Sequence, residues 1–166
     1  MHRMTGTELI DSFYSAFQAR DHQAMARCYH PEVIFSDPVF TNLKGWKASA
    51  MWRMLCERGK DLELQYRDVE ADDDKGSAFW EAHYTFSQTG KKVHNKIQAK
   101  FRLKDGLIVE HRDTFDLKAW MGMALGWQGK ILGQFGFGRA AVQKKAATGL
   151  DIYIQKQNLG PDDFNQ

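Results

Sequence analysis

Four consecutive stretches of the chain alternate apolar and polar residues with the period of two that is typical of β-strands. They read LELQYRDVE, AFWEAHYTF, VHNKIQAKFRL and LIVEHRDTFD. The short turn sequences DDDKG, TGKK and KDG separate them, which is the spacing of successive hairpins. Strands joined in this way form an antiparallel meander. Because helical patterns precede the meander, the sequence predicts an α+β fold in which helices cover one face of a curved sheet.

Three helices and one further strand are predicted ahead of the meander. Thr5 and Glu8 form a capping box, and apolar residues then recur at helical spacing through Phe17. Asp21 can cap a second, short helix that we expect to end at His30, just before a proline. The strand VIFSDPVF follows, and WKASAMWRMLCERG predicts a third helix that stops at Gly59. These helices supply the layer that packs on the sheet.

The residues after Asp116 are not needed to complete the predicted fold of helices and curved sheet. AWMGMALG predicts a short helix, GWQGKILGQFGFG an apolar loop with five glycines, and RAAVQKKAATGLDIYIQKQ a terminal helix. We therefore divide the chain into a domain over residues 1–120 and a helical C-terminal extension over residues 121–166. The extension fits two roles equally well, a lid over a pocket or a tail that packs on the outside or on a partner chain.

Composition excludes several classes of protein. The 166 residues include 23 basic and 21 acidic side chains, intermixed, with a net charge of +2, so no nucleic-acid partner is expected. Cys28 and Cys56 lie in helical apolar patterns and are expected to be reduced, packed thiols. We expect neither a metal nor another cofactor. No stretch approaches the roughly 18 apolar residues of a membrane span, and the protein is expected to be soluble and cytoplasmic.

Strand parity predicts polar side chains among the apolar residues of the inner sheet face. Trp80 and Tyr84 share that face in one strand, and Asn95 lies among apolar neighbours in the next. In the last strand, His111 and Asp113 share a face with Leu107, Val109 and Phe115. A concave apolar surface with a few convergent polar groups is typical of a small-molecule pocket.

Asp37 adds a second carboxylate, because it has the parity of Val33 and Phe35 in the first strand. Each of these polar residues also has a structural interpretation. Asp37, placed before a proline, could close an Asx turn. Asp113 could pair with His111 or Asn95 in a buried network. His111 could be a hydrogen-bonded core histidine, and the aromatic residues could simply fill the core.

The order of elements resembles the nuclear-transport-factor-2-like superfamily, in its SnoaL-like and ketosteroid-isomerase-like branch. The resemblance covers residues 5 to about 120 and is carried by QARDHQAMARCYHPEVIFSDPVF, by the helix after Gly45 and by GLIVEHRDTFD. It implies a cone-shaped sheet, a pocket for a small hydrophobic molecule and a homodimer.

The resemblance also implies roles for individual residues. Asp37 falls in a segment similar to the one that holds the general base of ketosteroid isomerase. Asp113 resembles the catalytic acid that SnoaL-like cyclases carry on their last strand, with His111 as a partner that could tune it. The oxyanion-hole positions of the isomerase fall on Phe13, beside Tyr14, and on Ala99, and neither Phe13 nor Ala99 is a hydrogen-bond donor through its side chain.

Three functions remain open at this point. In the first, the protein is an isomerase or cyclase that acts on a small hydrophobic carbonyl compound, with Asp37, Asp113 and His111 as catalytic residues. The ligand-binding residues expected around them are Tyr14, Trp46, Trp80, Tyr84, Asn95 and Phe115. In the second, the same fold is a non-catalytic module for binding a hydrophobic ligand or for dimerisation. In the third it is an interaction domain whose cavity is filled by Trp46, Trp80 and Phe115.

Overall fold

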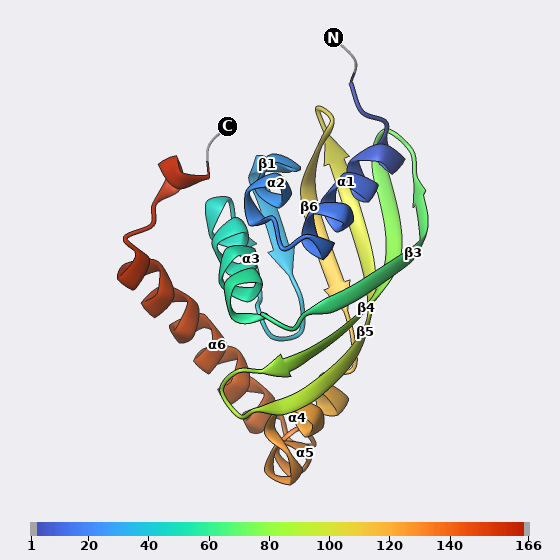
Figure 1. Ribbon diagram of the computed structural model, residues 1–166. Helices are drawn as coiled ribbons and strands as arrows, with labels where there is room; N and C mark the ends of the chain where they lie inside the picture. The colour runs from blue at the N-terminus through green and yellow to red at the C-terminus, as the bar shows by residue number, and fades with distance from the viewer. Residues whose placement is uncertain (1–2, 165–166) are drawn as a thin grey trace.

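The computed structural model describes residues 3–164, which form an α+β fold as predicted. Figure 1 shows its elements. In chain order they are α1 (Gly6–Gln18), α2 (His22–Arg27), β1 (Tyr29–Ser36), β2 (Leu43–Lys44), α3 (Trp46–Arg58), β3 (Glu63–Ala71), β4 (Lys75–Phe86), β5 (Lys91–Lys104), β6 (Leu107–Thr114), α4 (Leu117–Leu125), α5 (Trp127–Leu132), α6 (Gly136–Gln157) and the short 3₁₀ helix η1 (Pro161–Asp163).

The sheet has six strands in the order β2-β1-β6-β5-β4-β3. The predicted meander is confirmed, since β3 to β6 pair antiparallel with their neighbours in sequence order. The sheet is nevertheless mixed, because β1 runs parallel to β6 and joins it to β2. It curves around α1, and α2 and α3 lie beside α1 on the same side (Figure 1). The predicted arrangement of helices on one face of a curved sheet is therefore confirmed.

The first helix begins where the sequence predicts. The Thr5 side chain accepts a hydrogen bond from the Glu8 backbone N–H at 3.1 Å, and the Thr5 N–H donates to the Glu8 carboxylate at 3.3 Å. Both hydrogen bonds of the capping box are thus present, and they satisfy N–H groups that the helix leaves free. The apolar face of α1 is buried against the sheet; it consists of Leu9, Ile10, Phe13, Tyr14, Ala16 and Phe17.

The prediction that the second helix reaches His30 is wrong. Helix α2 ends at Arg27, and strand β1 begins at Tyr29. Pro31 therefore lies inside the strand, at a place where the pairing of β1 with β6 is irregular between Tyr29 and Ile34. A proline is tolerated there because an irregular stretch does not require its missing N–H. The consequence for the site is that Tyr29 is a strand residue with a buried side chain.

Strand parity is confirmed in β4 and β5 but changes within β6. Ile108 pairs with Leu103 and is fully buried, so it takes the core position that we assigned to Leu107 and Val109. The pairing between β5 and β6 shifts at this point, which is the signature of a β-bulge. Beyond the bulge the predicted parity returns, and His111 and Asp113 are buried on the inner face.

The C-terminal extension is more helical than predicted. The expected glycine-rich loop contains a complete short helix, α5, and α6 begins at Gly136. Two glycines explain the difference, because a Cβ atom on Gly129 would collide with the Met121 carbonyl oxygen and one on Gly138 with that of Leu132. These glycines allow α4, α5 and α6 to pack at backbone contact. None of the helices in residues 3–164 has the length and apolarity of a membrane-spanning segment.

Candidate active site

A cavity of about 250 Å³ lies between the inner face of the sheet and helices α3, α4 and α6. Its wall is mainly apolar and includes Phe17, Val39, Phe40, Trp52, Leu55, Ile97, Trp120, Leu125, Val142 and Ala146. Six of the residues predicted for the site line it, namely Asp37, Trp80, Tyr84, Asn95, Asp113 and Phe115. Segments far apart in the chain thus meet at one small chamber, and both carboxylates open into it.

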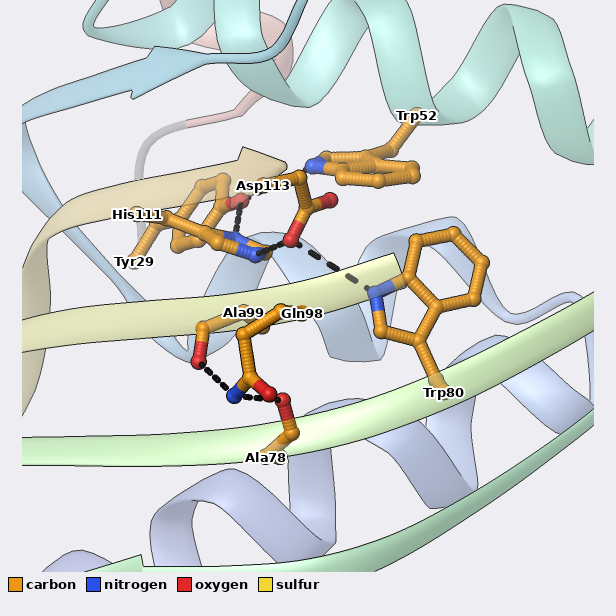
Figure 2. A network of polar contacts seen from close by, with 8 residues as sticks. All are labelled: Tyr29, Trp52, Ala78, Trp80, Gln98, Ala99, His111 and Asp113. Atoms are coloured by element: carbon orange, nitrogen blue, oxygen red, sulfur yellow. Dashed lines mark hydrogen bonds and ion pairs between the residues drawn. The ribbon is translucent and has the colours of Figure 1, made fainter. Parts of the chain in front are cut away.

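Asp113 is held by a chain of hydrogen bonds that runs into the core (Figure 2). Its Oδ1 lies 2.9 Å from Nε2 of His111, whose Nδ1 lies 2.7 Å from the Tyr29 hydroxyl. That hydroxyl accepts a hydrogen bond of 2.8 Å from the Trp52 indole N–H. Trp80 approaches the same carboxylate oxygen at 3.5 Å, a longer contact. Asp113 therefore sits at the cavity end of an otherwise buried network.

The fixed donors in this network determine which atom donates and which accepts in each hydrogen bond. An indole nitrogen can only donate, so the Tyr29 oxygen accepts from Trp52 and its own proton is free for Nδ1 of His111. Nδ1 then acts as the acceptor, and the proton on Nε2 is donated to Asp113. In this arrangement every polar atom of the imidazole and the phenol has a partner. Oδ2 of Asp113 has none among residues 3–164, which leaves it for a molecule in the cavity.

Replacing Tyr29 by phenylalanine tests the network. The change removes one hydroxyl and leaves the Trp52 N–H and Nδ1 of His111 buried without partners, so we expect a loss of about 1–3 kcal/mol in the free energy of unfolding. Tyr66→Phe is the matched control, because the Tyr66 hydroxyl makes only an exposed contact of 3.4 Å with Ser15 and its loss should be nearly neutral. Chemical denaturation of the two variants measures this. Equal effects would contradict the network.

Asp37 follows strand β1 and has both a structural contact and access to the cavity. Its Oδ1 accepts from the backbone N–H groups of Val39 at 2.7 Å and Phe40 at 2.6 Å, which is the predicted Asx turn. The carboxyl group nevertheless has a pKa raised to about 7. Burial is the main cause, and the nearby charge of Asp113 adds to it, while the two backbone donors oppose it. Asp37 therefore exchanges a proton near neutral pH.

Two neutral hydrogen-bond donors face the same space. The Tyr84 hydroxyl accepts a hydrogen bond of 2.8 Å from the indole N–H of Trp120 on α4, so its own proton remains to be donated. Burial, with a contribution from Asp37, raises the pKa of Tyr84, which keeps the phenol protonated. Asn95 is buried on β5, and its amide has no hydrogen-bond partner among residues 3–164. A carbonyl oxygen in the cavity could accept from both.

Three residues predicted for the site do not line the cavity. His111 lies behind Asp113, at hydrogen-bonding distance. Tyr14 is fully buried in the core, stacked on Tyr66, and its hydroxyl is buried with no hydrogen-bond partner in the part of the chain that the structure describes. Trp46 stacks on Phe164, away from the chamber. Because Trp46 lies elsewhere and space remains between Trp80 and Phe115, the third hypothesis of a filled cavity is not supported.

The structure adds residues that sequence reasoning missed. Tyr29 and Trp52 hold His111, and Trp120 holds Tyr84. Tyr29 was assigned to a helix, although its parity with Val33 and Phe35 would have placed it on the inner face. Trp52 lies in the predicted third helix, but nothing in the sequence assigned its N–H a partner. Helix α6 contributes Val142, Lys145, Ala146 and Gly149 to the wall, so the extension covers the cavity.

Metal ligands do not cluster in the part of the chain that the structure describes. Among residues 3–164 there is no group of three His, Cys, Asp or Glu side chains that could hold a metal ion. Cys28 and Cys56 are both buried free thiols.

Comparisons with known proteins support the fold. Residues 10–111 match the SnoaL-like domain family. A candidate polyketide cyclase from Pseudomonas putida has a TM-score of 0.62 at 22% identity, covering 73% of this chain and 98% of its own. An LEH-like epoxide hydrolase from M. tuberculosis has a TM-score of 0.58 at 16% identity, covering 76% of this chain and 92% of its own.

A third similar structure is TerC, crystallised with polyporic acid. It has a TM-score of 0.59 at 19% identity and covers 70% of this chain and 95% of its own. No curated protein sequence matches the chain. At these identities the solved structures establish a shared fold, and the chemistry must be argued from the cavity itself.

Proposed function

Because the chain belongs to the SnoaL-like domain family, we propose that its cavity binds a small hydrophobic carbonyl compound and that Asp37 and Asp113 act on it as acid and base. One observation carries the proposal, namely that two carboxyl groups in different hydrogen-bonding environments open into one apolar chamber. Environments that separate the proton affinities of two carboxyl groups give one the role of acid and the other that of base.

The proposed reaction is a proton transfer next to the carbonyl group. Oδ2 of Asp113 removes a proton from the carbon beside the carbonyl, and the resulting negative charge moves to the carbonyl oxygen. Tyr84 and Asn95 donate hydrogen bonds to that oxygen, which is the role of an oxyanion hole. Asp37, protonated at and below about pH 7, then delivers a proton to another carbon of the substrate. In an unsaturated ketone the double bond is thereby moved, and Asp113 and Asp37 return to their starting protonation states by exchanging protons with the solvent.

The test is solvent deuterium exchange. Aromatic ketones of two and three rings, such as a naphthyl methyl ketone, are incubated with the protein in D₂O, and deuterium at the carbon beside the carbonyl is followed by NMR. We expect exchange faster than in buffer, and much slower exchange with a variant that carries both Asp37→Asn and Asp113→Asn. Exchange at the same rate with the double variant would refute acid and base roles for these residues.

A second candidate function is ligand binding without chemistry. The resemblance to ketosteroid isomerase assigns its oxyanion-donor positions to Phe13 and Ala99, and these two residues are fully buried and offer no side-chain donor. This observation favours a binding module, in which Tyr84 and Asn95 fix a carbonyl group only for affinity. Binding of a ketone with no deuterium exchange would establish this function in place of the first.

Gly149 provides a test of the cavity that serves both functions. Val142, Lys145, Ala146 and Gly149 share one face of α6, and a Cβ atom on Gly149 would meet no heavy atom within 4 Å. Gly149→Phe should fold at least as stably as the wild type, because glycine is unfavourable within a helix. It should also fill the cavity and weaken binding of a naphthyl methyl ketone by about tenfold or more, measured by calorimetry. Gly149→Ala is the control and should bind normally.

A further inference from the structure

Five large apolar side chains are exposed together on α5, on its connection to α6 and on the first turn of α6. They are Trp127, Ile131, Leu132, Phe135 and Phe137, which we call the apolar tip. Trp127 is 71% exposed and Phe137 is 69% exposed. Phe135 and Phe137 stack on one another, with ring centroids 5.4 Å apart. A group of this kind within a few residues is rare on the surface of a soluble protein and marks an interaction site.

Charge is distributed unevenly around the apolar tip. Residues 117–150 contain no acidic residue but five basic ones, namely Lys118, Lys130, Arg139, Lys144 and Lys145. All except Arg139, which is partly buried, are exposed. Lys91 reaches the same region from β5, since its side chain packs against Gly126 at the start of α5. The whole chain has a net charge of only +2, so positive charge is concentrated in this segment.

The backbone that carries the apolar tip is held by close packing and a hydrogen bond. Gly129 and Gly138 permit backbone contact of α5 with α4 and of α6 with α5, as described above. The Arg139 guanidinium donates to the Gly133 carbonyl oxygen at 2.9 Å and ties the connection to α6. Close packing at the glycines leaves the large side chains on the outside. Figure 1 shows α5 projecting at one end of the molecule beyond α4, where it is free to approach a surface.

We propose that the apolar tip docks onto the surface of an anionic phospholipid bilayer. Aromatic and leucine-type side chains surrounded by lysine and arginine are the composition of segments that lie in the membrane interface. The apolar side chains enter the boundary of the acyl chains, and the surrounding cations meet the lipid phosphates. A second copy of the chain suits this surface less well, because it would bring two groups of five cations together.

The position of the apolar tip also brings the cavity close to the bilayer. Helix α4 contributes Trp120 and Leu125 to the cavity wall, and α6 contributes Val142 and Lys145. Helix α5 joins these two helices, so docking at the apolar tip places the cavity wall next to the lipid phase. Docking does not depend on the proposed chemistry and can hold if the protein only binds its ligand.

The test is binding of the full-length protein to vesicles of phosphatidylcholine with and without phosphatidylglycerol. Trp127 is a natural reporter, since Trp52, Trp80 and Trp120 are buried and Trp46 is partly buried. We expect sedimentation with the anionic vesicles, weakened by salt, and protection of Trp127 fluorescence from acrylamide. The double variant Phe135→Ser with Phe137→Ser should bind at least about tenfold more weakly. Lys130→Gln should also weaken binding, but only to anionic vesicles.

The matched control is Ile152→Ser, which removes an exposed apolar side chain of α6 outside the apolar tip. It should bind vesicles like the wild type. Failure of the wild type to bind anionic vesicles at low salt would overturn the proposal, as would equal losses in the control and the Phe135 and Phe137 double variant. Protection of Trp127 from acrylamide in a dimer without vesicles would assign the surface to a second copy and would also overturn it.

Discussion

Replacing Asp37 by asparagine is expected to stabilise the protein at pH 8, by up to about 4 kcal/mol in the free energy of unfolding. The pKa of this carboxyl group is raised from 3.8 to about 7, and each unit of difference corresponds to about 1.4 kcal/mol. The value is an upper bound because the side chain is only partly buried. Asparagine can retain the Asx turn, since its carbonyl oxygen accepts the same two backbone N–H groups.

The effect depends on pH in a defined direction. Because the pKa is raised in the folded state, the wild type has its full stability below about pH 4, loses stability as the pH rises toward 7, and changes little above that. Asp37→Asn does not follow this course, so the two proteins should be equally stable at pH 4 and diverge toward pH 8. Denaturation at several pH values measures it. Asp37→Ala also loses the Asx turn, so its free energy of unfolding should be about 1 kcal/mol lower than that of Asp37→Asn.

Replacing Asp113 by asparagine is expected to lower the rate of deuterium exchange by about 10²- to 10⁴-fold. The variant loses the group that accepts the substrate proton. It keeps an oxygen that can accept from Nε2–H of His111, so the network toward Tyr29 need not break. Ketone affinity should therefore change much less than the exchange rate. Single-turnover exchange together with calorimetric titration separates these two effects.

Asp113→Asn also distinguishes the two candidate functions. A variant that binds the ketone normally and exchanges at the wild-type rate would exclude Asp113 as the base. If Asp113→Asn does not fold, the same measurements are made on Asp113→Glu, which keeps the carboxyl group but moves it by one methylene. That variant should fold and retain measurable but reduced exchange, because proton transfer requires close positioning.

Much of the site could be predicted because a strand has a simple period. Alternation in β4 and β5 placed Trp80, Tyr84 and Asn95 on one face, and the same reasoning placed Asp113 on the next strand. The period held for Asp113 although a bulge intervenes, because the bulge lies between Ile108 and Glu110, before His111 and Asp113. The site residues that lie on strands and face the core could thus be predicted from the sequence.

The remaining parts of the site depend on tertiary packing that has no local signal. Tyr29 was missed because a proline was taken as a helix boundary, whereas irregular pairing allows it inside β1. Trp120 is a partner of Tyr84 only because α4 turns back onto the end of β4. The helix α5 was missed because five glycines between residues 126 and 138 suggested a loop. In the folded protein, glycine instead permits close contact between helices.

The measurement that tests the central claim most directly is the titration of the Asp37 carboxyl carbon by NMR, in the wild type and in Asp113→Asn. The claim is that two carboxyl groups share one apolar cavity and that the charge of Asp113 raises the pKa of Asp37. It predicts a midpoint of about 7 in the wild type and a lower midpoint in the variant, because the charge of Asp113 helps to raise the pKa of Asp37. A midpoint near 3.8 that is the same in both proteins would show that Asp37 only closes the turn.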